Sequence, residues 1–147
     1  MRTILIIGAG RSASSLIQYL LNKSDKENLK ITIGDLSLAL AEKKANNHHN
    51  AKAIFLDIQN VAQRQNEIQN ADIVISMLPA HLHIEVARDC ISFKKNMVTA
   101  SYISNEMKSL DALAKENGVL LLNEIGLDPG IDHMSAMKII HEIEDKG

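Results

Sequence analysis

Short apolar runs alternate strictly with segments of helical periodicity, and this alternation limits what the chain can fold into. The run TILII at residues 3–7 ends in glycine, which is typical of a strand buried on both faces. The expected strands are 3–7, 30–35, 51–57, 71–79, 96–101 and 119–125, and the expected helices are 12–22, 37–47, 61–70, 83–93, 104–118 and 132–147. Such alternation predicts parallel strands with right-handed crossovers. We therefore expect the α/β class, with a doubly wound, Rossmann-like parallel sheet in three α/β/α layers.

The turn after the first expected strand carries a dinucleotide-binding pattern. Residues 8–13 read G-A-G-R-S-A, which matches G-x-G-x-x-A. The first glycine permits the tight turn, the second lets a pyrophosphate approach the backbone, and the alanine lets the helix pack on the sheet. The helix N-terminus then offers N–H groups and a partial positive charge to the phosphates. The residues predicted to bind the cofactor here are Gly8, Gly10, Arg11, Ser12 and Ala13.

An acidic residue at the end of the second expected strand bears on which dinucleotide is bound. Asp35 follows the run ITIG, at the position where a carboxylate accepts hydrogen bonds from the adenosine ribose. Because that carboxylate would repel a 2′-phosphate, we expect NAD, with NADP as the alternative. Arg11 weakens this preference, since it could pair with a phosphate. Asp35 could instead serve only as a helix cap or turn residue.

The loop SMLPAHLH at residues 76–83 follows the fourth expected strand. Such a loop normally packs beside the ribose and nicotinamide, so Met77, Leu78 and Pro79 are predicted to form an apolar wall of the cofactor site. His81 and His83 occupy alternate positions in the same loop. With no third ligand nearby in the sequence, we predict that they hold no metal.

A second crowded turn, GLDPGIDHM at residues 126–134, joins the last expected strand to the last expected helix. Together with VTASYIS at residues 98–104, it resembles the saccharopine dehydrogenase (saccharopine reductase) family, glutamate-forming branch. The resemblance covers essentially the whole chain. It implies a nicotinamide-linked oxidation of the CH–NH group of saccharopine to an imine, with hydrolysis to glutamate and 2-aminoadipate semialdehyde, or the reverse reaction, in lysine metabolism.

The family also implies roles for individual residues and for the parts of the chain. Ser101, Tyr102 and Asp128 match the substrate contacts, and Asp128 and Tyr102 are the candidate catalytic residues. Independently of the family, the position of Asp132 at the start of the last expected helix predicts that it is the N-cap. We expect residues 1–131 to be the dinucleotide-binding domain. Residues 132–147 would be a helix leading toward a substrate and dimerisation domain absent from this chain, so that the full-length enzyme is a homodimer and the chain alone is inactive.

Charge and composition narrow the partners further. The chain has 16 Lys and Arg against 18 Asp and Glu, and its formal net charge is −2. A near-neutral chain has no long-range field to gather nucleic acid or an anionic membrane surface, and no apolar run approaches the ~20 residues of a membrane span. The single cysteine, Cys90, cannot form an internal disulfide. We therefore expect a cytoplasmic protein that binds a small-molecule substrate, with no nucleic-acid or membrane partner.

Two other functions remain open from the sequence. One is a related dehydrogenase that acts on lysine or on a polyamine imine. The other is a non-catalytic domain that senses dinucleotides, which would share the glycine-rich turn. Such a sensor has no need of GLDPGIDHM, and this segment is what discriminates between them.

Overall fold

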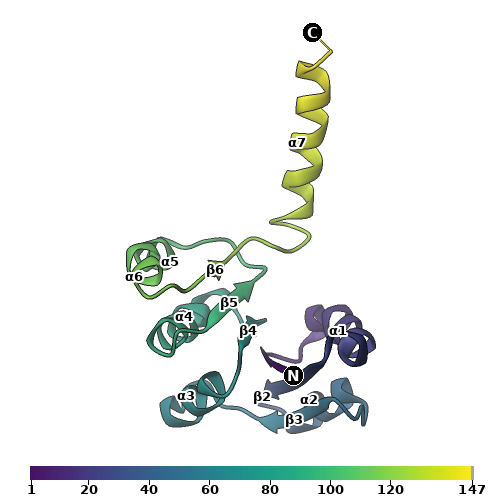
Figure 1. Cartoon of the computed structure of the whole chain (residues 1–147), viewed down its shortest axis with the longest axis vertical. Coiled ribbons are helices and arrows are strands. Elements are labelled where there is room, and N and C mark those ends of the chain that lie inside the picture. Colours follow the sequence, from purple (N-terminus) through teal and green to yellow (C-terminus); the bar gives the residue numbers. More distant parts are fainter. Residues whose placement is uncertain (147) are drawn as a thin grey trace.

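The chain forms one six-stranded parallel sheet with helices on both sides (Figure 1). In this computed structural model, which describes residues 1–146, the strand order is β3-β2-β1-β4-β5-β6. The strands are β1 Arg2–Ile7, β2 Leu29–Asp35, β3 Ala51–Phe55, β4 Ile73–Ser76, β5 Asn96–Thr99 and β6 Leu121–Leu122. The chain crosses over between β3 and β4, so that β4 lies beside β1. The predicted doubly wound, Rossmann-like fold is confirmed.

All helices except the last divide into two layers, one on each face of the sheet (Figure 1). They are α1 Ser14–Glu27, α2 Leu38–Ala45, α3 Val61–Gln69, α4 His83–Ser92, α5 Asn105–Ser109, α6 Asp111–Glu116 and α7 Ile131–Glu144, with 3-10 turns η1 Arg11–Ala13 and η2 Ala80–Leu82. One apolar core packs α1 and α2 against β1 and β2 on one face of the sheet. A second core packs α3, α4, α5 and α6 against the other face. Burial of these two apolar surfaces supplies the main driving force for the layered arrangement.

Two expected elements are interrupted. The single helix predicted at 104–118 is split at Leu110 into α5 and α6. Ser109 Oγ donates to the Glu106 carbonyl at 2.6 Å, a back-bond that competes with regular helix geometry. The sixth strand, predicted at 119–125, is only two residues long. Glu124 leaves the strand conformation with a φ of 60°, and its N–H donates to the Ser101 carbonyl.

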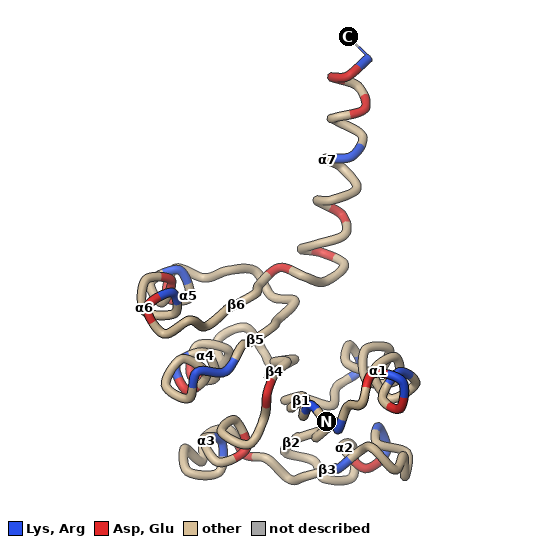
Figure 2. The backbone as a smooth tube through the Cα atoms, viewed as in Figure 1, with Lys and Arg blue, Asp and Glu red and all other residues tan. Residues whose placement is uncertain are grey.

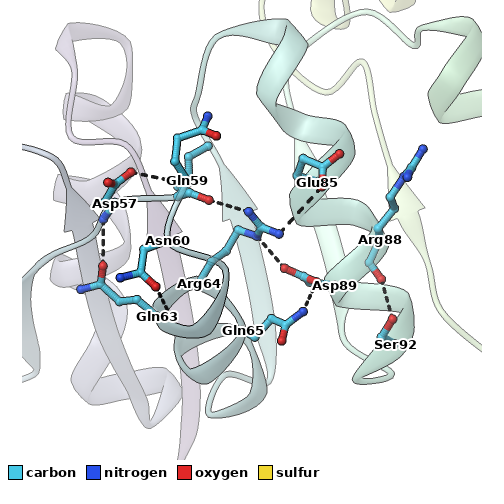
Figure 3. A network of polar contacts seen from close by, with 11 residues as sticks. Asp57, Gln59, Asn60, Gln63, Arg64, Gln65, Glu85, Arg88, Asp89 and Ser92 are labelled. Carbon is cyan, nitrogen blue, oxygen red and sulfur yellow. Dashed lines mark hydrogen bonds and ion pairs between the residues drawn. The ribbon is translucent and has the colours of Figure 1, made fainter.

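A buried ion pair holds α3 against α4 (Figure 3). Arg64 on α3 and Asp89 on α4 are 5% and 6% exposed, and Arg64 Nε lies 2.5 Å from Asp89 Oδ2. The guanidinium also donates to the Ile58 carbonyl, while Gln65 Nε2 donates to the other Asp89 oxygen at 2.9 Å. Both charges are therefore hydrogen-bonded as well as paired, which is the condition under which burial of charge is tolerated.

Helix α7 extends away from the sheet (Figure 1), and no residue of it is buried. It begins at Ile131, and the helix expected at 132–147 includes Gly147, which lies outside the described residues. Several of its apolar side chains are exposed, namely Ile131, Met134, Met137, Ile139, Ile140 and Ile143. In the part of the chain that the structure describes, no helix has both the length and the apolar character needed to cross a bilayer. Acidic residues outnumber basic residues along α7 (Figure 2).

Candidate dinucleotide and substrate site

The two glycines of the first turn, Gly8 and Gly10, are needed for different structural reasons. Gly8 has a φ of 106°, and a Cβ there would lie 2.8 Å from the Met77 carbonyl oxygen. Glycine is therefore required at position 8 by the positive φ and by the close approach of the Met77 backbone, directly after β4. Gly10 has an ordinary φ of −62°, and a Cβ built there meets nothing within 4 Å. Its Cβ would point into open space, which fits a residue kept small so that a bound phosphate can reach the backbone.

Most of the predicted cofactor residues line one cavity of about 310 Å³ at the carboxyl end of the sheet. Its walls include Gly8, Gly10, Asp35, Met77, Leu78 and Pro79. Ala13 is completely buried under the turn, while Arg11 and Ser12 are exposed beside it. Asp35 is the acidic group of this wall, and the other side chains are largely apolar. This combination suits an adenosine moiety, whose base is apolar on its faces and whose ribose offers hydroxyl donors.

The carboxylate of Asp35 also braces the glycine turn. Its Oδ2 accepts from the Ala9 N–H at 2.7 Å, and its Oδ1 accepts from the Ser37 N–H at 2.8 Å. Ser37, not Asp35, is the N-cap of α2, since its Oγ accepts from Leu40 N–H. Asp35 thus joins the start of α2 to the glycine turn while remaining a negative charge in the cavity wall.

A second cavity of about 390 Å³ lies beside the other end of the glycine turn. Met77 contributes to both cavities. The rest of the lining comes from Ile75 on β4, from Ser12 and Leu16 near the start of α1, from Val98, Thr99 and Ala100, and from Ile125 to Leu127. Its walls are mainly apolar. A dinucleotide spanning the turn would place its two halves on opposite sides of Gly10, as the Rossmann arrangement requires.

The structure brings Tyr102 and Asp128 together although 26 residues separate them. The Tyr102 hydroxyl donates to Asp128 Oδ1 at 2.6 Å. Asp128 lies at the tip of the turn 126–130, which is closed by a hydrogen bond from Gly126 N–H to the Pro129 carbonyl. The hydrogen bond to Asp128 is the main reason why the pKa of Tyr102 is raised above 10.0, since the carboxylate disfavours the phenolate.

This hydrogen bond predicts a measurable change in tyrosine ionisation. Replacing Asp128 with asparagine removes the charged acceptor, so we expect the pKa of Tyr102 to fall back toward 10.0. Ultraviolet difference absorbance would follow the phenolate in a Tyr19→Phe background, because Tyr19 is the only other tyrosine. The matched control is Asp111→Asn, whose carboxylate lies on α6 and pairs with Lys115. An unchanged Tyr102 titration in Asp128→Asn would show that the pair does not form in solution.

Two residues near this pair were missed by the sequence prediction. Glu124 Oε1 accepts from the Ile103 N–H at 3.0 Å and so links the loop after β5 to the turn after β6. The acidic residue inside the apolar run LLNEI was the available signal. His83, considered only as a metal ligand, is 3% exposed and contacts the Ser101 hydroxyl through Nε2 at 2.8 Å.

The interpretation of Asp132 as a helix cap is wrong in detail. The N-cap of α7 is Gly130, with a φ of 147°, and Asp132 lies in the first turn. Its Oδ1 accepts from the Gly130 N–H at 2.9 Å and also contacts His133 Nδ1. The Asp132 carboxylate therefore accepts a hydrogen bond from the N-cap residue, and Asp132 is not itself the N-cap. A negative charge in the first helical turn is also favourable to the helix dipole.

Comparison with known proteins gives a consistent set of relatives. Residues 4–122 match the family model described as saccharopine dehydrogenase NADP binding domain. A saccharopine dehydrogenase (NADP+, L-glutamate-forming) of Schizosaccharomyces pombe is 37% identical and aligns with 100% of this chain and 32% of its own length. An alpha-aminoadipic semialdehyde synthase of Arabidopsis thaliana is 33% identical over 97% of this chain and 15% of its own length.

Solved structures agree with this result. The apo saccharopine dehydrogenase (L-Glu forming) of Saccharomyces cerevisiae superposes with a TM-score of 0.89 at 34% identity, over 99% of this chain and 32% of that one. A 3-ketoreductase of Actinomadura kijaniata in complex with NADP gives a TM-score of 0.70 at 16% identity, which shows the fold alone. This chain thus spans about a third or less of the length of the relatives that it matches.

Proposed function

Since the chain belongs to the saccharopine dehydrogenase family, we propose that it provides the dinucleotide-binding part of an oxidoreductase that acts on the CH–NH group of saccharopine. The products would be glutamate and 2-aminoadipate semialdehyde, or the enzyme would run the reverse reaction. The observation that carries this proposal is the hydrogen bond between Tyr102 and Asp128 at the carboxyl edge of the sheet. A dinucleotide sensor needs the glycine turn but has no use for this pair. The names of the relatives support the same substrate class.

The pair would handle the charge on the substrate nitrogen. A secondary amine is a cation at neutral pH, and a carboxylate such as Asp128 can hold it and accept its proton as the C–N bond becomes an imine. Tyr102 would hold the carboxylate in place through its hydrogen bond. A bound nicotinamide would supply the acceptor for the hydride that leaves the carbon. Ser101 lies next to Tyr102 at the end of β5, where it is proposed to contact the substrate.

The proposed division of the chain follows the same reasoning. Residues 1–131 would form the dinucleotide-binding domain, and residues 132–147 would lead toward a substrate and dimerisation domain. The exposed apolar side chains of α7 support this proposal, because a helix of this composition is normally covered. The greater length of the relatives supports it as well. The assembled enzyme would then be a homodimer.

The cofactor is a nicotinamide dinucleotide. One observation favours NADP and another favours NAD. The printed names of the family model and of the fungal relative favour NADP over NAD. The turn 35–37 of this chain reads Asp-Leu-Ser and offers an anion where a 2′-phosphate would lie. Asp35 thus supports NAD as the cofactor preferred by this chain, with NADP as the alternative.

Titration with the two reduced dinucleotides tests both the site and the preference. We expect NADH to bind more tightly than NADPH. In Asp35→Asn the ratio of the NADPH to the NADH affinity should rise at least about tenfold, or roughly 1.4 kcal/mol, because a like charge is removed. Asp57→Asn is the matched control, because Asp57 also lies just after a strand, β3, but lines neither cavity. An unchanged ratio in Asp35→Asn would contradict the proposed preference, and no binding of either dinucleotide would contradict the proposed function.

A further inference from the structure

The ring of His83 connects the carboxyl ends of two neighbouring strands. Its Nδ1 lies 2.8 Å from Ser76 Oγ at the end of β4. Its Nε2 lies 2.8 Å from Ser101 Oγ and 3.3 Å from Thr99 Oγ1 at the end of β5. His83, Ser76 and Thr99 are each at most 3% exposed, whereas Ser101 is half-buried. Only the Ser101 hydroxyl therefore has access to the space outside this cluster.

The ring in this cluster is neutral. Burial lowers the pKa of His83, and the nearby His81 lowers it further. His81 and Glu106 line the same cavity of about 320 Å³ as His83 and Tyr102, but the partners of the two ring nitrogens are hydroxyl groups. A neutral imidazole has one N–H donor and one acceptor nitrogen. The arrangement of hydrogens among the hydroxyls thus decides which nitrogen carries the proton.

The buried hydroxyls favour a proton on Nε2. The Ser76 hydroxyl is completely buried, and His83 Nδ1 is its partner, so its hydrogen is used only if Nδ1 is the acceptor. A proton on Nδ1 would leave that hydrogen unsatisfied. It would also make the Ser101 and Thr99 hydroxyls compete for one lone pair on Nε2. A buried donor without an acceptor is unfavourable, because it loses its hydrogen bonds to water and gains none in the protein. The alternative, with Nε2–H donating to Ser101 Oγ, leaves at most the Thr99 hydrogen without a good acceptor.

We infer that His83 is a positioning residue whose Nε2–H donates to Ser101, so that the Ser101 hydroxyl is left to donate its own proton to an oxygen of the bound ligand. This role rests on the proposed function, because the ligand is the cofactor or substrate of the same site. Ser101 follows Thr99 and Ala100, which line the cavity of about 390 Å³, and precedes Tyr102, which lines the one of about 320 Å³. The acceptor is a carboxamide oxygen of the nicotinamide or a carboxylate oxygen of the substrate.

Nitrogen-15 NMR of the histidine rings tests the tautomer directly. The full chain contains six histidines, and His83→Gln would identify the signal of His83. We expect Nε2 of His83 to be protonated and Nδ1 unprotonated in the neutral ring. Protonation on Nδ1, or a ring that carries both protons at neutral pH, would overturn the inference. This measurement needs no cofactor, so it stays decisive even if the proposed function fails.

Paired variants test the consequence for ligand binding. A glutamine at position 83 can donate an amide N–H near the place of Nε2, whereas an asparagine reaches only the place of Nδ1. NADH and ADP-ribose serve as probes, because ADP-ribose lacks the nicotinamide. If the acceptor is the carboxamide, Ser101→Ala and His83→Asn should each weaken NADH binding about five- to tenfold, with ADP-ribose binding unchanged and His83→Gln close to the original protein.

If the acceptor is a substrate carboxylate, the same loss should appear in the binding of L-glutamate to the NADH complex. Equal behaviour of His83→Gln and His83→Asn with every probe would overturn the positioning role. So would a Ser101→Ala variant that binds NADH and L-glutamate as the original protein does. If the original protein bound neither NADH nor ADP-ribose, the result would instead contradict the proposed function.

Discussion

Replacement of Asp89 with alanine should lower the free energy of unfolding by about 3–5 kcal/mol, which is the usual cost of leaving one member of a buried ion pair without its partner. The buried Arg64 guanidinium would lose its closest carboxylate partner and keep the more distant Glu85, whose Oε2 lies 3.8 Å from Nη2 and whose side chain is 50% exposed. Gln65 Nε2 would lose its acceptor at the same time. Because the pair joins α3 to α4, the second apolar core should loosen on that side of the sheet. Urea denaturation followed by circular dichroism would measure the change.

The exposed pair between Asp111 and Lys115 provides the control. The two side chains are 65% and 75% exposed and lie four residues apart on the surface. Asp111→Ala should cost less than about 0.5 kcal/mol. Replacing Asp89 and Arg64 together with leucine and methionine should recover part of the loss, since neither charge is then left alone. Similar losses for Asp89→Ala and Asp111→Ala would show that the buried pair does not stabilise this fold.

Replacement of Gly10 with valine should abolish most dinucleotide binding without unfolding the protein. A Cβ at this position meets nothing within 4 Å, and the φ of −62° suits any residue, so the stability should change little. The added methyl groups would occupy the space through which a pyrophosphate reaches the backbone. We expect the Kd for the preferred dinucleotide to rise at least about a hundredfold, or roughly 2.8 kcal/mol. Isothermal titration calorimetry would measure the Kd, and thermal unfolding would confirm that the variant is folded.

Gly8 offers the contrasting variant in the same turn. Its Cβ would lie 2.8 Å from the Met77 backbone oxygen at a φ of 106°. Gly8→Ala should therefore reduce stability as well as binding, since the backbone itself must shift. If Gly10→Val bound dinucleotide normally, the phosphates would have to lie elsewhere. The glycine turn would then be a purely structural feature.

The α/β fold class, the three layers and the glycine turn could be predicted from the sequence because they depend on local patterns. The Gly8 and Gly10 spacing and the apolar strands are readable from neighbouring residues, and the structure collected most of the predicted cofactor residues in one cavity. The contact between Tyr102 and Asp128 was implied by family resemblance and not by spacing. It depends on the placement of two loops after neighbouring strands, which no periodicity describes.

The features that the sequence did not predict are those in which a polar side chain finds a distant partner. Glu124 read as part of a strand, and His83 as one of two alternate loop histidines. Their hydrogen bonds to Ile103 and Ser101 arise only when the strand ends are assembled. The split of the helix at Leu110 follows directly after the back-bond of Ser109, a local contact that helix propensity does not reveal.

The contact of Asp35 with the Ala9 N–H limits how this site can change over evolution or by engineering. The same carboxylate that would select between two dinucleotides also shapes the turn that is proposed to hold the phosphates of either one. Under the proposed function, a single substitution at position 35 would therefore alter the choice of cofactor and the strength of binding together. A lineage that exchanges one dinucleotide for the other without losing affinity would need a second, compensating substitution near residue 9. Pairs of changes, and not single ones, are the expected trace of a switch in cofactor use among relatives of this chain.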